Sequence, residues 1–409
     1  MEKQNKFNER GITLVALVIT IIILLILAGI SISSLTGSGL FENAKLAEER
    51  TKNAQEKEQS ILSQYEQIMN GYLLKDTENT KPVSAMPAGS TVIESDPSKG
   101  IVIADKNENE WTWVEVPKTT VFKTAQNATD YANIKTDLIN YATTYREGKE
   151  GQERYWSDTW YEGCGIVAEG EKTAEQVYTE KYNKMLSSVY TNGGFWISRY
   201  EIGDATATAN NATRVDGQGK TGKAVSKVDQ IPYNWVTCSQ AQELASGMTP
   251  DKTKYTSSLL FGIQWDLVCK YLEVNVNWDT TSRTAISYLN SNSSSWGNYS
   301  NNANVILSRG KYNPTLDVSG TWTQYTNTAI SKNLITTGAY ENANKMNIYD
   351  FAGNVWEWTL EKATANFSYP CAVRGGASFD NGSYIPASIR DNVSTSYDRY
   401  GIGFRSALY

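Results

Sequence analysis

The side chains that most often carry catalysis or bind metals are scarce in this chain. It contains no histidine, which removes the commonest general base and a frequent metal ligand. Its four cysteines, Cys164, Cys238, Cys269 and Cys371, lie far apart and show no Cys-x-x-Cys spacing, so we expect no zinc site. Outside the cell they could form disulfides in any of three pairings. Burial as free thiols is an equal alternative on the sequence alone.

Oxygen ligands are better represented, in the segment 347–359. The carboxylates of Asp350 and Glu357, together with the backbone carbonyls of Gly353 and Val355, could surround one hard cation. Calcium prefers such oxygen ligands, so the segment predicts a structural calcium site. The alternative is that the aspartate caps a turn while the two tryptophans of the segment pack in a core.

Composition narrows the range of partners. The formal net charge is −6, so no overall positive field attracts nucleic acid, and we expect no nucleic-acid partner. The chain has 25 Tyr and 12 Trp against 9 Phe. Tyrosine and tryptophan combine apolar area with a polar group, which suits both cores and binding surfaces. We expect most of them in the core.

The N-terminal part predicts a long helix that would carry the rest of the chain. Residues 12–32 form an apolar run without a charge, and about 20 residues rising roughly 1.5 Å each can cross a ~30 Å hydrocarbon core. Residues 40–74 continue with apolar positions at roughly helical spacing. We therefore expect one helix over 12–74, apolar in its first half and amphipathic in its second, after a polar leader over 1–11.

The remainder predicts a linker and one further domain. Residues 75–90 are rich in Pro, Ser and charge without an apolar period, as linkers are. Beyond them, short strand-like segments alternate with turns and a few helical pieces, which favours an irregular α+β domain over 91–409. The expected strands include 111–116 and 194–200, the expected helices 239–244 and 264–272, and the expected loops 124–192, 203–228 and 277–347.

The run Arg-Gly-Ile-Thr-Leu at 10–14, followed by aliphatic residues, resembles the N-terminus of type IV prepilins. The resemblance implies that a prepilin peptidase cuts after Gly11, so that Ile12 becomes the first mature residue. Pilins usually carry a glutamate at the fifth mature position, which is Ala16 here. The departure favours a minor pilin, a pseudopilin or a plain membrane anchor. The partners implied are the membrane, prepilin peptidase and pilus or pseudopilus subunits.

Three C-terminal motifs together resemble the formylglycine-generating-enzyme family, which has a C-type-lectin-like fold. They are the segment 347–359 with its Gly-Asn-Val-Trp-Glu-Trp core, Val-Arg-Gly-Gly at 373–376, and Gly-Ile-Gly-Phe-Arg at 401–405. Weaker similarity extends the resemblance over 91–409. Members of this family bind calcium at the first motif. Arg374 and Arg405 are expected to be buried hydrogen-bonding hubs and not catalytic groups.

The resemblance also predicts which chemistry is lost. Enzymes of the family hold copper with two cysteines that follow Arg-Gly-Gly, and these positions are occupied here by Asp380 and Ile385. Copper(I) requires soft ligands such as thiolates, which neither residue supplies. Related branches hold iron with histidines, which this chain lacks. We expect no oxidase activity and no catalytic cofactor.

The segment 377–400, between two of these motifs, resembles the hypermutated stretch of variable proteins of diversity-generating retroelements. Its Tyr, Ser, Asp, Asn and Arg content is typical of antibody binding loops. On this resemblance Gly382, Pro386, Arg390 and Gly401 hold the backbone. The alternative is an ordinary loop of an enzyme-like domain. The expected target-binding positions are Ala377, Ser378, Asp380, Tyr384, Ile385, Ile389, Asp391, Asn392, Val393, Tyr397, Asp398, Arg399 and Tyr400.

The sequence as a whole predicts a non-catalytic protein that displays a binding surface. We expect it at the cell membrane and cell surface, with one N-terminal transmembrane helix, an extracellular C-terminal domain and a protein or glycan as target; association with a pilus is left open. Two alternatives belong to other classes. One is an enzyme of altered metal chemistry that uses Asp380 or Tyr384, and the other is a purely structural minor pilin.

Overall fold

The computed structural model describes residues 18–28, 50–52, 85–146, 156–207, 222–314, 321–364 and 368–409. The chain divides into two compact units, Met1–Ser63 and Gln64–Tyr409. The first unit contains two described helical stretches, 18–28 and 50–52. The rest of the predicted helix 12–74, with Gly11 and Ile12, lies outside the described residues. Among the residues that the structure describes, no helix is both long enough and apolar enough to span a membrane.

The second unit is built on a six-stranded sheet with all neighbouring strands antiparallel. The last strand of the chain, β19, lies inside this sheet between β5 and β9, so the C-terminus is part of the core. The predicted strands 111–116 and 194–200 are confirmed as β3 and β5. In spatial order the strands are β1 (Thr91–Glu94), β2 (Val102–Ala104), β3 (Glu110–Glu115), β5 (Gly194–Ser198), β19 (Ser406–Leu408) and β9 (Ser257–Leu259).

A second, five-stranded sheet contains the motifs that the sequence singled out. Its order is β17 (Arg390–Val393), β16 (Cys371–Arg374), β15 (Trp356–Ala363) and β18 (Ile402–Phe404), and β4 (Trp156–Ser157) pairs with the far end of β15. Strands β15 and β18 run parallel, and the other pairs are antiparallel. The segment 377–400 leaves this sheet after β16, contributes β17, and returns towards β18.

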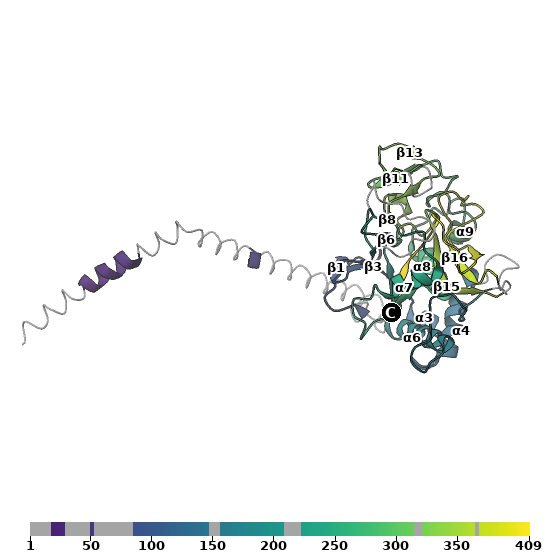
Figure 1. The fold of residues 1–409 in the computed structure, drawn as a ribbon, viewed down its shortest axis with the longest axis horizontal. Coiled ribbons are helices and arrows are strands. Elements are labelled where there is room, and N and C mark those ends of the chain that lie inside the picture. The colour runs from purple at the N-terminus through teal and green to yellow at the C-terminus, as the bar shows by residue number, and fades with distance from the viewer. Residues whose placement is uncertain are drawn as a thin grey trace, which may run out of the picture. The chain divides into compact units, whose positions relative to one another are not determined.

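Helices pack on both sheets. Helix α6 (Ala174–Asn192) begins with a capping box in which Thr173 and Gln176 satisfy each other's backbone N–H groups, and it ends at Gly193, whose φ of 72° suits glycine. Helix α8 (Gly262–Asn275) contacts β3 of one sheet and β15 of the other. Helices α3, α4 and α6 gather at one end of the unit, and β11 and β13 lie at the opposite end (Figure 1).

One predicted loop was wrong. The stretch 124–192 contains α4 (Tyr131–Tyr141) and α6, whose buried residues Val177, Met185 and Val189 recur at helical spacing. The polar residues that suggested a loop cover the solvent face of α6. The predicted helices 239–244 and 264–272 are confirmed as α7 (Cys238–Ser246) and α8.

The remaining elements are short and lie mostly in the predicted loop regions. They are α3 (Lys118–Val121), α5 (Thr143–Arg146), α9 (Ala285–Asn290), η3 (Glu341–Ala343), β6 (Gly203–Asp204), β7 (Ala224–Val225), β8 (Ile231–Pro232), β10 (Val305–Ile306), β11 (Lys311–Asn313), β12 (Thr323–Gln324), β13 (Ala329–Ile330) and β14 (Leu334–Ile335).

Tryptophan side chains fill the main core of the second unit, as the composition predicted. Trp111, Trp113, Trp196, Trp265 and Trp358 are all fully buried. The helices and sheets of this unit confirm the predicted mixture of α and β structure, while the long N-terminal helix stays a prediction.

Candidate functional site

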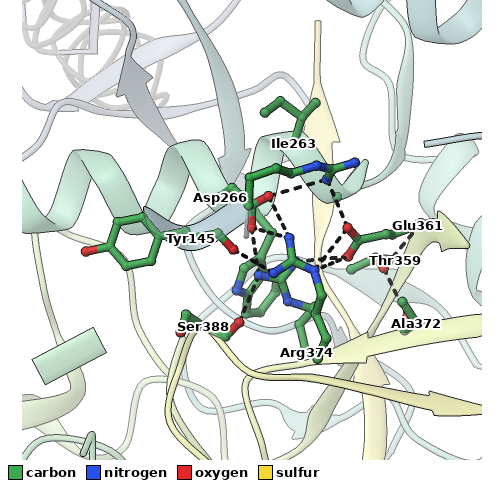
Figure 2. Close-up of polar contacts among 12 residues, drawn as sticks. Tyr145, Ile263, Asp266, Thr359, Glu361, Ala372, Arg374 and Ser388 are labelled. Atoms are coloured by element: carbon green, nitrogen blue, oxygen red, sulfur yellow. Dashed lines mark hydrogen bonds and ion pairs between the residues drawn. The ribbon is translucent and has the colours of Figure 1, made fainter. Parts of the chain in front are cut away.

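A buried network of charges lies between α8 and the second sheet (Figure 2). The guanidinium of Arg374 donates to Asp266 at 2.9 Å and to Glu361 at 3.0 Å. Arg390 reaches the same two carboxylates, Asp266 at 2.6 Å and Glu361 at 3.0 Å. The side chains of Asp266, Glu361 and Arg374 are wholly buried and that of Arg390 almost so. Each acid thus bridges two arginines, which is how buried charges are tolerated.

A third arginine completes the balance of charge. Arg146 lies 2.9 Å from Glu361 and 3.1 Å from Asp158, which brings the network to three arginines and three acids. Burial alone would raise the pKa of Asp266, but Arg390, Arg374 and Arg146 outweigh it and hold the pKa below its usual value. Asp266 therefore stays ionised at neutral pH.

This network also closes the loop that follows β16. Arg374 donates through Nε to the carbonyl of Ile389 at 2.9 Å and through Nη2 to that of Ser388 at 3.1 Å. Arg390 Nη1 donates to the carbonyl of Tyr145 at 2.7 Å. These hydrogen bonds hold both ends of the stretch 375–389 in place, and they do not involve the side chains within it. Sequence reasoning expected Arg374 as a hub but missed the three acids and Arg146.

Arg405 is the centre of a separate buried site and confirms the second expected hub. It donates to the carbonyls of Ser198 at 2.9 Å and Tyr349 at 2.7 Å, and lies 3.0 Å from Glu357. Because both oxygens of Glu357 accept from this guanidinium, the carboxylate is already neutralised.

The calcium site stays a prediction, and the structure shows what its two carboxylates contact. Glu357 faces a guanidinium, which repels a cation. Asp350 accepts from the backbone N–H of Gly338 at 2.7 Å, and its other oxygen, although buried, has no hydrogen-bond partner among the described residues. Burial raises the pKa of Asp350 to about 7. Within the described part of the chain, no three acidic or thiol side chains are placed to hold a metal. The carbonyls of Gly353 and Val355 would be left with one carboxylate.

The two positions expected to replace copper ligands have structural roles. Asp380 accepts from the backbone N–H of Ala377 at 2.9 Å and also interacts with the indole of Trp356. Ile385 packs against the main core. Burial raises the pKa of the Asp380 carboxyl. The aspartate therefore caps a tight turn.

All four cysteines are free and buried, so the structure favours thiols over the disulfide alternative. Cys238 lies 3.3 Å from the hydroxyl of Tyr161. The pKa of Cys238 is raised well above its usual value, most by contact with Cys371 and next by burial. Burial raises the pKa of Cys164 to about 11. Because their pKa values are raised, Cys164 and Cys238 keep their protons at neutral pH and are poor nucleophiles or metal ligands.

The expected target-binding positions are not equally accessible. Ala377, Ser378, Ile389 and Asp398 are buried, so they cannot contact a target in this structure; here the expectation was wrong. Because the segment is built largely of turns, its buried and exposed residues do not alternate regularly. The sequence pattern therefore did not show which side chains would be buried. Tyr384, Asp391 and Arg399 are exposed, while Asp380, Ile385, Asn392, Val393, Tyr397 and Tyr400 are partly buried.

The residues expected to hold the backbone do lie at close contacts. A Cβ atom on Gly382 would come within 2.8 Å of the backbone of Ser294, and one on Gly401 within 2.5 Å of the Phe379 ring. Pro386 is buried, and Arg390 belongs to the charge network. The segment thus has fixed points between its accessible side chains.

A cavity of about 290 Å³ opens on the other face of the second sheet. Its floor is formed by Trp356, Val373 and Ile402 on three neighbouring strands. Because side chains alternate along a strand, Val373 points away from the face to which Arg374 sends its guanidinium. One face of the sheet therefore contains the charge network and the other the cavity.

The walls of the cavity come from the segment 377–400. The rings of Phe379, Tyr397 and Tyr400 surround the floor, and Asp391, Val393 and Arg399 also line the cavity. Sequence reasoning included most of these residues but missed Phe379, Trp356, Val373 and Ile402.

Comparisons with known proteins bear on most of the C-terminal unit. A family model described as the sulfatase-modifying factor enzyme 1-like domain matches residues 166–408. Treponema denticola variable protein 1 resembles the chain at 16% identity with a TM-score of 0.30, covering 53% of this chain and 84% of its own. PvdO from Pseudomonas aeruginosa has the same identity and TM-score, covering 53% of this chain and 81% of its own. No curated protein sequence matches the chain.

Proposed function

The chain belongs to the sulfatase-modifying factor enzyme 1-like family, and from this premise we propose that its C-terminal unit is a binding module that catalyses no reaction. The module presents the segment 377–400 to a target. The observation that carries the proposal is the cavity, whose walls belong to this segment while the opposite face of the sheet is fixed by buried ion pairs.

The residues at the two positions where the family's enzymes carry copper-binding cysteines argue against the chemistry of those enzymes. Asp380 and Ile385 offer no soft ligand to copper(I). Asp380 already caps a backbone turn and interacts with Trp356. The four thiols of the chain are buried, and a buried thiol keeps its proton. The absence of histidine from the sequence removes the ligands of the iron-dependent branch.

The accessible side chains of the segment favour binding. Tyr384, Asp391 and Arg399 are exposed on a backbone whose ends are tied to the core. Tyrosine and arginine are common in binding sites because each offers a large contact area together with polar contacts. A fixed frame lowers the entropy that a loop loses on binding. The proposal includes diversification of this segment at the gene level.

The N-terminal sequence supports display at the cell surface. The uncharged run 12–32 is long enough to anchor the chain in a bilayer, and the residues at 10–14 fit processing by prepilin peptidase. The proposal therefore places the binding module outside the cell on a membrane anchor.

Catalysis can be tested directly. The full-length chain, supplied with copper(I) and a peptide containing the cysteine motif of a sulfatase, should leave the cysteine unchanged by mass spectrometry. Conversion of that cysteine to formylglycine would contradict the non-catalytic part of the proposal. An active enzyme of the family serves as the positive control.

Binding can be tested on a protein and glycan array. Replacement of Tyr384, Asp391 and Arg399 together by alanine should abolish or change the set of bound partners. The matched control replaces a tyrosine, an acid and a base that are also exposed but lie outside the segment: Tyr369, Glu180 and Lys172. If the control triple changes binding as much as the first one, the segment is not the binding surface.

A further inference from the structure

The cavity lined by the segment 377–400 has a shape and polarity that select one kind of occupant. We propose that it accepts a single aromatic side chain of a target protein, flanked in the target by a basic and an acidic residue. This inference rests on the proposed binding function and names the chemistry of its partner.

The size of the cavity sets the first limit. At about 290 Å³ it lies at the lower end of the range for small-molecule pockets, roughly 300–1,000 Å³. One large side chain fills such a space, and a second would not enter. The cavity therefore suits an anchor residue more than an extended ligand.

The floor is apolar, which sets the second limit. Val373 and Ile402 have no polar side-chain atoms, and the indole of Trp356 interacts with the carboxyl group of Asp380. A sugar ring with hydroxyls around its edge would leave some of them unpaired at this floor, and an unpaired buried polar group is costly. An aromatic ring makes no such demand.

The walls are arranged to receive a ring. Phe379 and Tyr400 meet edge to face, with ring centroids 5.8 Å apart. Tyr400 is also braced by Trp235 at 6.3 Å. An inserted ring can meet these faces and edges in the offset or edge-to-face geometry that aromatic pairs prefer.

The exposed lining supplies two charges of opposite sign. Asp391 and Arg399 are both exposed and both line the cavity, and the guanidinium of Arg399 lies 5.1 Å from the Tyr397 ring. A target segment with a basic residue on one side of its aromatic residue and an acidic residue on the other complements this arrangement.

The first experiment uses small probes on the full-length chain in lipid nanodiscs, with isoleucine and valine methyl groups labelled for NMR. N-acetyl-tryptophanamide should bind with a Kd of about 0.1–1 mM and shift the methyl signals of Val373, Val393 and Ile402. Methyl α-mannopyranoside should cause no saturable shift. Saturable binding of the sugar at these methyl groups, or no binding of the indole, would overturn the inference.

Two variants locate the binding in the cavity. Val393→Trp should fill the space and weaken the indole probe at least about 10-fold, and Tyr397→Ala should weaken it by removing a wall. The matched controls are Val274→Trp and Tyr369→Ala, at exposed positions outside the cavity, and both should leave the Kd unchanged. Equal effects of variants and controls would contradict the assignment. Melting temperatures establish that each variant is folded.

The charge requirement is tested with acetylated, amidated tripeptides. Lys-Trp-Glu should bind several-fold more tightly than Gln-Trp-Gln, and the advantage should disappear in the double variant Asp391→Asn, Arg399→Gln. If the peptides bind equally to the unaltered chain, the flanking charges play no part.

These outcomes separate the inference from the function on which it rests. Array binding that depends on Tyr384 but not on the cavity variants would leave the binding function intact and remove the aromatic anchor. Loss of all dependence on the segment 377–400 would remove both.

Discussion

Asp266 and Glu361 each pair with three arginines, Arg146, Arg374 and Arg390, which belong to different parts of the chain. Arg374 lies on β16 and Arg390 on β17, so the two acids connect strands on either side of the loop 375–389. A buried ion pair adds little net stability compared with apolar residues, but loss of one partner leaves the others unpaired. The importance of this network therefore lies in the cost of breaking it.

Arg390→Met should lower the free energy of unfolding by about 3–5 kcal/mol, because it removes one of the three cations that balance the three buried carboxylates of the network. Arg309→Met is the matched control: Arg309 pairs with Glu341 at 2.9 Å on the surface and should cost less than about 1 kcal/mol. Urea unfolding measures both. Similar losses of unfolding free energy in the two variants would show that burial of the network does not increase the cost of breaking it.

The thiols give a second prediction at this scale. In the native chain without reductant, Ellman's reagent should titrate no cysteine, because all are buried and the pKa of Cys238 is raised by contact with Cys371 and by burial. In guanidinium all four should react. A count of two in guanidinium would reveal a disulfide.

At the scale of elements, the turn before β15 fixes where the second sheet begins. Gly353 has a φ of 78°, and a Cβ atom there would lie 2.1 Å from the carbonyl oxygen of Asn298. The backbones of two distant segments touch here, and the parallel bridge between Asn298 and Gly353 depends on that contact.

Gly353→Ala should therefore cost more than about 3 kcal/mol, since the clash adds to the strain of a left-handed alanine. Gly170 also has a positive φ, 60°, but a Cβ atom there would meet nothing within 4 Å. Gly170→Ala should cost only about 1 kcal/mol. Thermal unfolding of the two variants separates the cost of the left-handed backbone from the cost of the steric clash. Equal losses of stability would mean that the close approach at Gly353 is unimportant.

The sequence predicted those elements whose pattern is local. Strands β3 and β5 and helices α7 and α8 were expected at nearly their observed bounds. Helix α6 was missed because its polar face dominates its composition. The acids Asp266 and Glu361 carry no local signal either, because their partners are remote: Arg390 lies 124 residues beyond Asp266.

The floor of the cavity was missed for a related reason. Trp356, Val373 and Ile402 belong to three motifs that indicated a scaffold, and only the strand register brings their side chains together on one face. The backbone-holding residues of the segment could be expected from residue type, since glycine permits close approach. Burial of Ala377 and Ile389 could not, because it depends on the turn capped by Asp380 and on packing against the core.

At the scale of the whole C-terminal unit, the position of β19 is decisive. Its three residues pair with β5 on one side and β9 on the other, and Tyr409 is buried with its backbone bonded to Thr256. The main sheet is thus two separate pieces until the last residues join them.

Deletion of Ser406–Tyr409 should abolish cooperative thermal unfolding of this unit, because the buried strand that joins β5 to β9 and its hydrogen bonds are lost. Removal of residues 1–63, a separate compact unit, should leave the melting temperature of the second unit nearly unchanged. Circular dichroism of both truncated chains provides the comparison. A shortened chain that still melts cooperatively near the temperature of the intact protein would refute this account of the sheet.

Because a ribosome makes a chain from its N-terminus, β19 emerges after every other strand of the six-stranded sheet. Domains fold as units during or after synthesis, and here β5 and β9 cannot be joined before β19 is available. Until then the sheet lacks the strand that links its two parts. The order of synthesis therefore makes closure of this sheet a late step in the folding of the unit.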